Sequence, residues 1–298
     1  MKLGIDLGGT KIEIAIFSDT NDIEWKKRVM TPVSNYSQVV ETLRQLIEES
    51  LNATGFKGPV GMSIPGSESP ANGLIRGANS QVLNGKNLVN DVENCSGREV
   101  RVANDANCFV LSESTDGSAQ KANSVFGVII GTGCGGGLVL NKQLVSGFNN
   151  ISGEWGHNPL PWQTESELKY ENCWCGLKGC LETYISGTAV SKDYKKLTGI
   201  ELSVQEILDK TLTDEIAELV IKQLEDRLSR ALSTVINMID PEIIVLGGGL
   251  SNIERLYDSV PKLWNKYVFS DLIETRLLKP MYGDSSGIRG AAWLWNDI

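Results

Sequence analysis

The chain has 298 residues and a net charge of −9, with 41% hydrophobic and 22% charged side chains. This composition is typical of a globular protein, and the length suffices for two domains of about 150 residues each. An acidic chain repels phosphate backbones and anionic lipid headgroups, so we expect neither nucleic acid nor membrane as a partner. No apolar stretch approaches the ~18 residues of a spanning helix, and Asp6 lies where a signal peptide would be apolar. We therefore expect a cytoplasmic protein.

The sequence predicts mainly strands in the first half of the chain. Runs and alternations of apolar residues predict strands at 3–7, 12–17, 25–29, 59–64 and 99–103. Apolar residues at helical spacing predict a helix over about 39–51, with Ser34 or Ser37 as its N-cap and Gly55 at its end. The stretch 112–124, rich in Ser, Gly, Asp and Asn, is the best candidate for a linker.

A similar pattern begins again after this stretch. Strands are predicted at 125–130, 137–140, 143–145 and 242–246. Helices are predicted from about Thr183, over about 213–238 and over 253–263, and a cysteine-rich insertion precedes the first of them. The two halves are therefore expected to share an architecture, although their amino-acid sequences differ.

A glycine-containing turn lies between the first two predicted strands, where Asp6 is followed by Gly8, Gly9, Thr10 and Lys11. Glycines allow a tight turn whose N–H groups can face an anion. A carboxylate beside bound phosphate is repulsive unless a cation lies between them. Mg²⁺ on nucleotide phosphates, held through water by Asp6, removes this conflict. The alternative is an ordinary Gly-Gly hairpin turn.

Two more glycine clusters follow buried strands in the second half. They comprise Gly131, Thr132 and Gly133 in one cluster and Gly247, Gly248 and Gly249 in the other. The first cluster lacks the Walker lysine and a strand-to-helix context, so neither a P-loop nor a Rossmann fingerprint fits, and a second phosphate-binding hairpin is favoured. The other cluster allows a purine or ribose to lie against the backbone. The alternative there is a tight strand-to-helix turn.

Polar side chains follow the strand predicted at 99–103, beginning with Asn104 and Asp105. The carboxyl ends of strands in open α/β sheets are where ligands bind. A carboxylate flanked by amides suits a general base that acts on a sugar hydroxyl. The alternative is an Asx turn that caps a helix starting near Cys108.

A candidate metal site combines His157, the only histidine, with Cys173, Cys175 and Cys180. One His and three Cys make a common structural zinc set, and the intervening glycines allow the thiolates to converge. Free thiols beside an ordinary histidine are the alternative. Two carboxylates flank this set: Glu154 and Glu182 can accept sugar hydroxyls, or they are simply solvated.

These motifs together resemble the ROK family of sugar kinases and sugar-responsive repressors, and the similarity extends from Gly4 to Ala292. The resemblance implies an α/β, actin-like ATPase fold of two ribonuclease-H-like domains with a cleft between them. It implies that residues 1–118 and a C-terminal helix over 288–298 form one domain. Residues 119–287 would form the other, with the zinc-binding insertion. A homodimer is the assembly that the resemblance implies.

The resemblance also implies ATP-dependent phosphorylation of a hexose hydroxyl. Asp105 would take the hydroxyl proton and Asp6 would organise Mg²⁺, while both hairpins would donate to the ATP phosphates and the Gly247 cluster would contact the nucleoside. The implied sugar-binding residues are Gly66, Asn79, Asn104, Asp105, Glu154, His157 and Glu182, and His157 would serve zinc as well.

Segments 64–67, 77–80, 83–85 and 156–162 are similar to bacterial fructokinases that also accept mannose. We therefore expect D-fructose to be converted to fructose 6-phosphate and N-acetylglucosamine to be poor, because its acetamido group needs extra space. The alternatives are an N-acetylglucosamine kinase or glucokinase of the same family, or a non-catalytic sugar sensor, against which the intact Asp6 and Asp105 count. We expect no repressor, because the first hairpin begins at residue 6.

Overall fold

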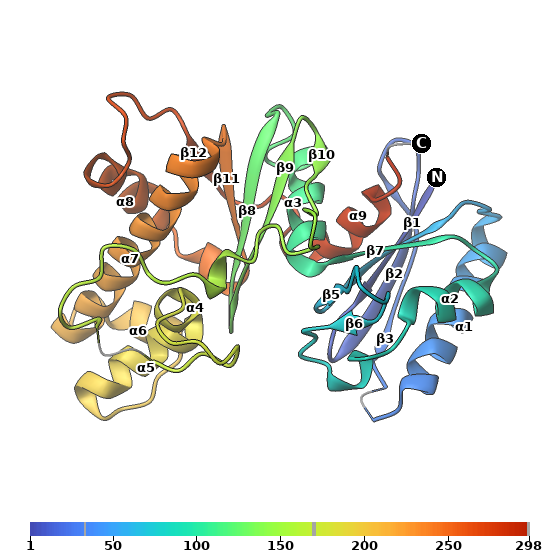
Figure 1. The fold of residues 1–298 in the computed structure, drawn as a ribbon, viewed down its shortest axis with the longest axis horizontal. Coiled ribbons are helices and arrows are strands. Elements are labelled where there is room, and N and C mark those ends of the chain that lie inside the picture. The colour runs from blue at the N-terminus through green and yellow to red at the C-terminus, as the bar shows by residue number, and fades with distance from the viewer. Residues whose placement is uncertain (33, 169–170, 297–298) are drawn as a thin grey trace. The chain divides into compact units, whose positions relative to one another are not determined.

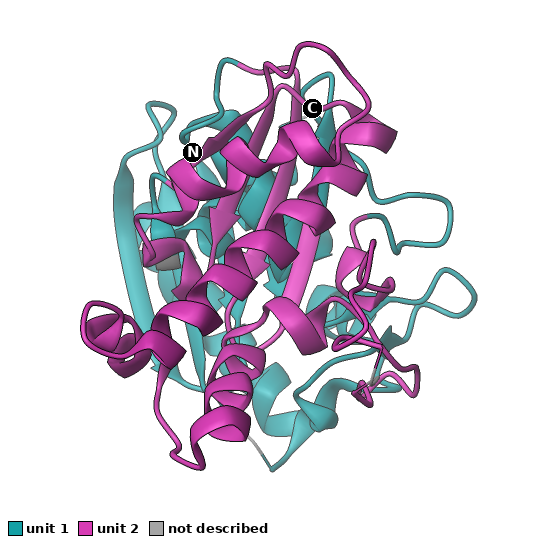
Figure 2. Ribbon diagram, turned by 90° about the vertical axis from the view of Figure 1, so that its left-hand side faces the viewer, with its two compact units in different colours: residues 1–121, 137–152, 281–298 teal, residues 122–136, 153–280 magenta. Residues whose placement is uncertain are grey.

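The computed structural model describes residues 1–32, 34–168 and 171–296. The chain forms two compact units (Figure 2). Unit 1 comprises Met1–Lys121, Gly137–Ser152 and Met281–Ile298, and unit 2 comprises Ala122–Gly136 and Gly153–Pro280. The units differ from the domains expected from the sequence because residues 119–121, 137–152 and 281–287 belong to unit 1, which contains the first half of the chain.

A five-stranded sheet forms the centre of unit 1, in the order β3-β2-β1-β4-β7. Figure 1 labels β1, β2, β3 and β7 of this sheet. Its strands are β1 (Lys2–Leu7), β2 (Lys11–Phe17), β3 (Ile23–Met30), β4 (Val60–Ile64) and β7 (Val100–Asn104). The first three are antiparallel neighbours, whereas β4 and β7 run parallel to β1. All five strands were predicted. The register sets Asp6 beside Glu13 of β2 and Ser63 of β4, which fixes the position of that carboxylate at the end of β1.

The helices of unit 1 are α1 (Tyr36–Thr54), α2 (Leu88–Ser96), α3 (Asp105–Thr115) and α9 (Ser286–Trp293), with short 3-10 turns at Gln81–Leu83 and Gly283–Ser285. Helix α1 buries an apolar stripe that includes Leu43 and Ile47, as its spacing predicted, and Gly55 ends it in the left-handed conformation. The predicted N-cap was wrong: Asn35, not Ser34 or Ser37, accepts the N–H of Ser37 at 2.9 Å.

The helix after β7 begins earlier than predicted. It starts at Asp105 instead of near Cys108, because the side chain of Asn104 accepts the N–H of Asn107 at 2.7 Å and caps it there. It continues to Thr115, so residues 112–115 of the predicted linker are helical. A small hairpin of β5 (Ser67–Glu68) and β6 (Ile75–Arg76) was not predicted.

A second five-stranded sheet has the order β10-β9-β8-β11-β12. Its strands are β8 (Ser124–Ile130), β9 (Cys134–Leu140), β10 (Gln143–Leu144), β11 (Ile243–Gly247) and β12 (Arg276–Leu278). β8 and β11 are parallel neighbours and almost wholly buried, as their apolar sequences predicted. The last strand, β12, was not predicted.

The helices of unit 2 are α4 (Glu182–Ile185), α5 (Gly187–Thr198), α6 (Val204–Lys210), α7 (Glu215–Ile239) and α8 (Leu256–Leu263), with 3-10 turns at Trp155–His157, Gly249–Asn252 and Trp264–Lys266. The helix expected from Thr183 is two helices, because Ser186 ends α4 and caps α5. The helix expected over 253–263 begins at Leu256. Across the described residues, no helix combines the length and apolar character needed to cross a membrane.

Candidate functional site

Asp105 is the first residue of α3 and lies directly after β7. One of its carboxylate oxygens accepts the N–H of Ala106 at 2.9 Å, and the side chain keeps an exposed surface. Surrounding protein nevertheless raises the pKa of Asp105, because desolvation outweighs its backbone hydrogen bonds. A carboxylate that is accessible and more basic than usual can accept a proton from a bound hydroxyl.

Asp6 is a second perturbed carboxylate in unit 1. Desolvation raises its pKa from the usual 3.8 to about 6, a hydrogen bond to Ser63 opposes this shift, and the charge of Asp105 adds to it. Two neighbouring carboxylates that disfavour each other's charge attract a divalent cation. The two residues expected to act as base and metal organiser therefore influence each other electrostatically.

The first hairpin connects β1 to β2, as predicted, but its amides are not all available. The N–H of Gly8 donates to the carbonyl of Lys11 at 3.0 Å, so it closes the turn and does not face an anion. Thr31 fixes the hairpin through its hydroxyl, which donates to the carbonyl of Gly8 at 2.8 Å, and through its N–H, which donates to Thr10 at 3.0 Å. A phosphate would thus use the amides of the other hairpin residues.

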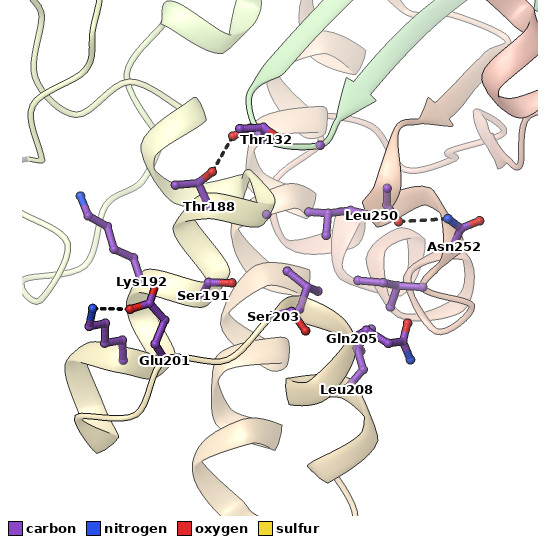
Figure 3. Close-up of a pocket in the computed structure, with 16 residues that line it drawn as sticks. Thr132, Thr188, Ser191, Lys192, Glu201, Ser203, Gln205, Leu208, Leu250 and Asn252 are labelled. Carbon is purple, nitrogen blue, oxygen red and sulfur yellow. Dashed lines mark hydrogen bonds and ion pairs between the residues drawn. The ribbon is translucent and has the colours of Figure 1, made fainter. Parts of the chain in front are cut away.

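A pocket of about 700 Å³ lies within unit 2 and brings together part of each of the other two glycine clusters (Figure 3). Gly133, Gly247 and Gly248 are not among the residues that line it. Gly131 and Thr132 line it from the turn between β8 and β9, and Gly249 lines it from the turn after β11. The hydroxyl of Thr188, at the start of α5, donates to the carbonyl of Thr132 at 2.9 Å. Backbone-rich walls at one end and the apolar side chain of Leu250 at the side suit a nucleotide.

Two glycines keep this pocket open. Gly248 has a φ of 77°, and a Cβ there would lie 2.5 Å from the carbonyl oxygen of Ile130. Gly187 donates to the carbonyl of Gly131 at 2.7 Å, and a Cβ on it would lie 3.0 Å from the same oxygen. A side chain at either position would therefore displace the turn that follows β8.

Most residues that line this pocket were missed by sequence reasoning. They come from α5, α6, the segment between these helices and the turn after Gly249, and comprise Gly187, Thr188, Ser191, Lys192, Lys195, Glu201, Ser203, Val204, Gln205, Leu208, Leu250, Asn252 and Ile253. Ser186 followed by Gly187 at a helix start was the one usable signal, since a capped helix with glycine at its first position admits an anion close to its backbone.

The four predicted metal ligands lie close together in the structure. The ligand atoms of His157, Cys173, Cys175 and Cys180 all lie within 4.8 Å of one another. Cys175 Sγ is 3.7 Å from Cys180 Sγ, and Cys173 Sγ is 3.5 Å from His157 Nδ1. A tetrahedral zinc ion with bonds of about 2.3 Å to sulfur and about 2.0 Å to nitrogen needs separations of roughly 3.7 and 3.5 Å. The donor set therefore fits zinc in both chemistry and spacing.

Glu182 and Glu154 take different roles beside this set. Glu182 Oε2 accepts the N–H of Cys134 at 2.9 Å, and a Cβ on Gly133 would lie 2.6 Å from the same oxygen. Glu182 thus packs against the hairpin that lines the pocket of unit 2. Glu154 is exposed and precedes the 3-10 turn that carries His157.

The remaining predicted sugar-binding residues lie near β5 and β6. Gly66 has a φ of 77°, and a Cβ there would lie 2.3 Å from the carbonyl of Arg76. Asn79 is exposed, two residues after Gly77. The structure thus places Asn104, Asp105, Gly66 and Asn79 in unit 1, and Glu154, His157 and Glu182 in unit 2.

The two five-stranded sheets and the helices packed with them define the class of protein, an α/β chain with the actin-like ATPase fold. Residues 2–298 match the ROK family, and the chain belongs to that family.

Relatives match along almost the whole chain. It is 40% identical to an N-acetyl-D-glucosamine kinase of Yersinia enterocolitica and 37% identical to one of Pasteurella multocida, with 99% of each chain covered in both cases. Among solved structures, the ROK hexokinase from Thermus thermophilus aligns with a TM-score of 0.87 and 28% identity, over 98% of this chain and 97% of that chain.

Proposed function

We propose that this protein is an ATP-dependent sugar kinase whose preferred acceptor is N-acetyl-D-glucosamine. The choice of N-acetyl-D-glucosamine as the acceptor rests on the 40% identity, over 99% of both chains, to a relative named for that activity. Our expectation of fructose is not supported by these relatives and is replaced by the alternative stated with it.

Asp105 is the proton acceptor in this proposal. Phosphoryl transfer needs little covalent chemistry from a protein, so its main tasks are to align the sugar oxygen with the γ-phosphorus and to exclude water. The raised pKa of Asp105 makes it a better base than an ordinary aspartate as the hydroxyl proton is released. Asn104 is occupied in capping α3, which holds the neighbouring carboxylate in place.

The pocket of unit 2 is the proposed nucleotide site. The turn at Gly131 and Thr132 would lie along the phosphates, and the Gly249 turn would lie against the nucleoside. Mg²⁺ bound to ATP neutralises phosphate charge, and Asp6 is the residue proposed to hold it through water. Remaining amides of the hairpin Gly8–Lys11 would donate to the phosphates.

Zinc has a structural role in this proposal. Cys180 Sγ lies 3.5 Å from the carbonyl oxygen of His157, so the metal loop packs against the segment that follows Glu154. Cys173 Sγ lies 3.9 Å from Glu182 Oε1. A bound ion would therefore order two proposed sugar ligands without touching the reacting atoms. A homodimer remains a prediction that light scattering after size exclusion can test.

An ADP-release assay with MgATP and single sugars tests the proposed function. We expect turnover with N-acetylglucosamine, and phosphorus NMR of the product should show a sugar monophosphate. Release of ADP without sugar, or none with any hexose or N-acetylhexosamine, would contradict the kinase proposal.

A further inference from the structure

Helix α9 packs against the sheet of unit 1 through positions where glycine is required. A Cβ on Gly4 of β1 would lie 2.1 Å from the carbonyl oxygen of Ile288, and one on Gly61 of β4 would lie 1.8 Å from that of Ala291. A Cβ on Gly290 would lie 1.7 Å from the carbonyl of Cys108 in α3. Backbone therefore touches backbone on both sides of α9, and the helix has little freedom to shift.

The first turn of α9 reaches the carboxylate of Asp6. A Cβ built on Gly287 would lie 3.1 Å from Asp6 Oδ2, 3.2 Å from Cγ and 3.3 Å from Oδ1. Because the three distances are almost equal, the flat face of the carboxyl group lies over this glycine. A methyl group there would press on all three atoms at once.

A buried carboxylate anchors the same turn. Glu113 of α3 accepts the hydroxyl of Ser286 at 2.9 Å, and it also accepts the N–H groups of Met281 at 3.0 Å and Ser118 at 2.9 Å. Glu113 is fully buried. These bonds fix the segment that leads into α9, and therefore the position of Gly287 relative to Asp6.

We propose that Gly287 is a positioning residue for Asp6, and that the Ser286–Glu113 hydrogen bond holds Gly287 in place. The proposal rests on the proposed function, in which Asp6 holds the nucleotide-bound metal. The bare Cα leaves the carboxylate in the orientation that this role needs. Groups behind a metal ligand commonly change metal affinity or activity by 10–100-fold when altered.

The variant Gly287→Ala separates this role from a merely structural one. Alanine favours helices more than glycine does, and this gain offsets part of the cost of the new contact with Asp6, so the melting temperature should stay close to that of the wild type. The Mg²⁺ concentration for half-maximal activity should rise by about 10-fold. The extra rise in melting temperature that MgADP gives over ADP alone should shrink, and this readout does not depend on turnover.

Trp293→Phe is the matched control in the same helix. It removes the hydrogen bond from Trp293 Nε1 to Asp116 at 3.1 Å, far from Asp6, so stability should fall while the Mg²⁺ response stays as in the wild type. Ser286→Ala should also raise the Mg²⁺ concentration needed for half-maximal activity. If Gly287→Ala does not fold, Ser286→Ala alone tests the proposal.

A wild-type Mg²⁺ requirement and MgADP response in Gly287→Ala, or in Ser286→Ala where only that variant folds, would overturn the inference. An altered response in Trp293→Phe equal to that of Gly287→Ala would also overturn it, since general loosening of α9 would then explain both. Absence of any MgADP response in the wild type would instead contradict the proposed role of Asp6.

Discussion

Asp105 is the residue on which the proposed chemistry depends most. Asp105→Asn preserves the shape of the side chain but cannot accept a proton, so kcat should fall by at least ~10²-fold with a modest change in KM. Steady-state kinetics measure this, with Asp258→Asn, at an exposed ion pair of α8, as the control. A variant that retains more than about half of the wild-type kcat would contradict the assignment.

The pH dependence of activity follows from the same carboxylates. Burial raises the pKa of Asp105, and that of Asp6 is about 6. Both act in the ionised form, so protonation at low pH removes activity, and the loss should begin above the range of ordinary carboxyl groups. We expect kcat/KM to fall as pH drops through about 6. A profile that stays flat down to about pH 4.5 would show that neither raised pKa governs catalysis.

Ionised Asp6 should also lower the stability of the metal-free protein. Its pKa is raised on folding, so its stabilising contribution is present at low pH and is lost as pH rises from the usual 3.8 through about 6. Asp6→Asn should therefore raise the melting temperature near pH 7.5 without Mg²⁺, while abolishing Mg²⁺-dependent activity. The difference in melting temperature should vanish below about pH 4. A lower melting temperature for the variant near pH 7.5 would mean that ionised Asp6 stabilises the fold.

The metal loop is the element whose order should depend most on a ligand. Few apolar side chains support it, so metal binding should supply much of its local folding free energy. We expect about one zinc ion per chain by atomic emission, and Cys175→Ser should lose the metal and raise the KM for sugar through displaced Glu154 and Glu182. Cys95→Ser in α2 is the control. Fully active, metal-free wild-type protein would contradict the zinc assignment.

Strands were more predictable than the ends of helices. Apolar segments such as β2 and β8 are buried along almost their whole length, so their sequence patterns located them. For α1, Ser34, Asn35 and Ser37 can all cap a helix, and the choice rests on the extended backbone of Asn35, which composition does not reveal. The start of α3 at Asp105 was missed for the same reason.

The candidate site was predictable where a few residues carry the chemistry. His157 and Cys175 combine rare residue types, and Asp105 follows a strand directly, so each gave a strong signal. In contrast, Ser191 and Gln205 are polar residues on helices, where polar side chains are the norm, and only the fold brings them to the pocket of unit 2.

At the scale of the whole molecule, distant segments complete unit 1. Residues 137–152 and 281–298 belong to unit 1 together with the first 121 residues. Glu113 accepts hydrogen bonds from Met281 and Ser286, where the chain re-enters this unit. Such contacts depend on pairs far apart in sequence, so the return of the C-terminal helix could be expected only from the family resemblance. The motifs did not predict the preferred sugar either, because small differences in the shape of the sugar pocket decide which hydroxyl or acetamido group is accepted.

A competition between sugars tests the central claim most directly. N-acetylglucosamine and fructose at equal concentration share a limiting amount of MgATP, and mass spectrometry measures the two sugar phosphates. Their ratio equals the ratio of kcat/KM values and is free of errors in enzyme concentration. The account predicts at least about 10-fold more N-acetylglucosamine phosphate, a transition-state difference of about 1.4 kcal/mol. Equal products, or an excess of fructose phosphate, would contradict it.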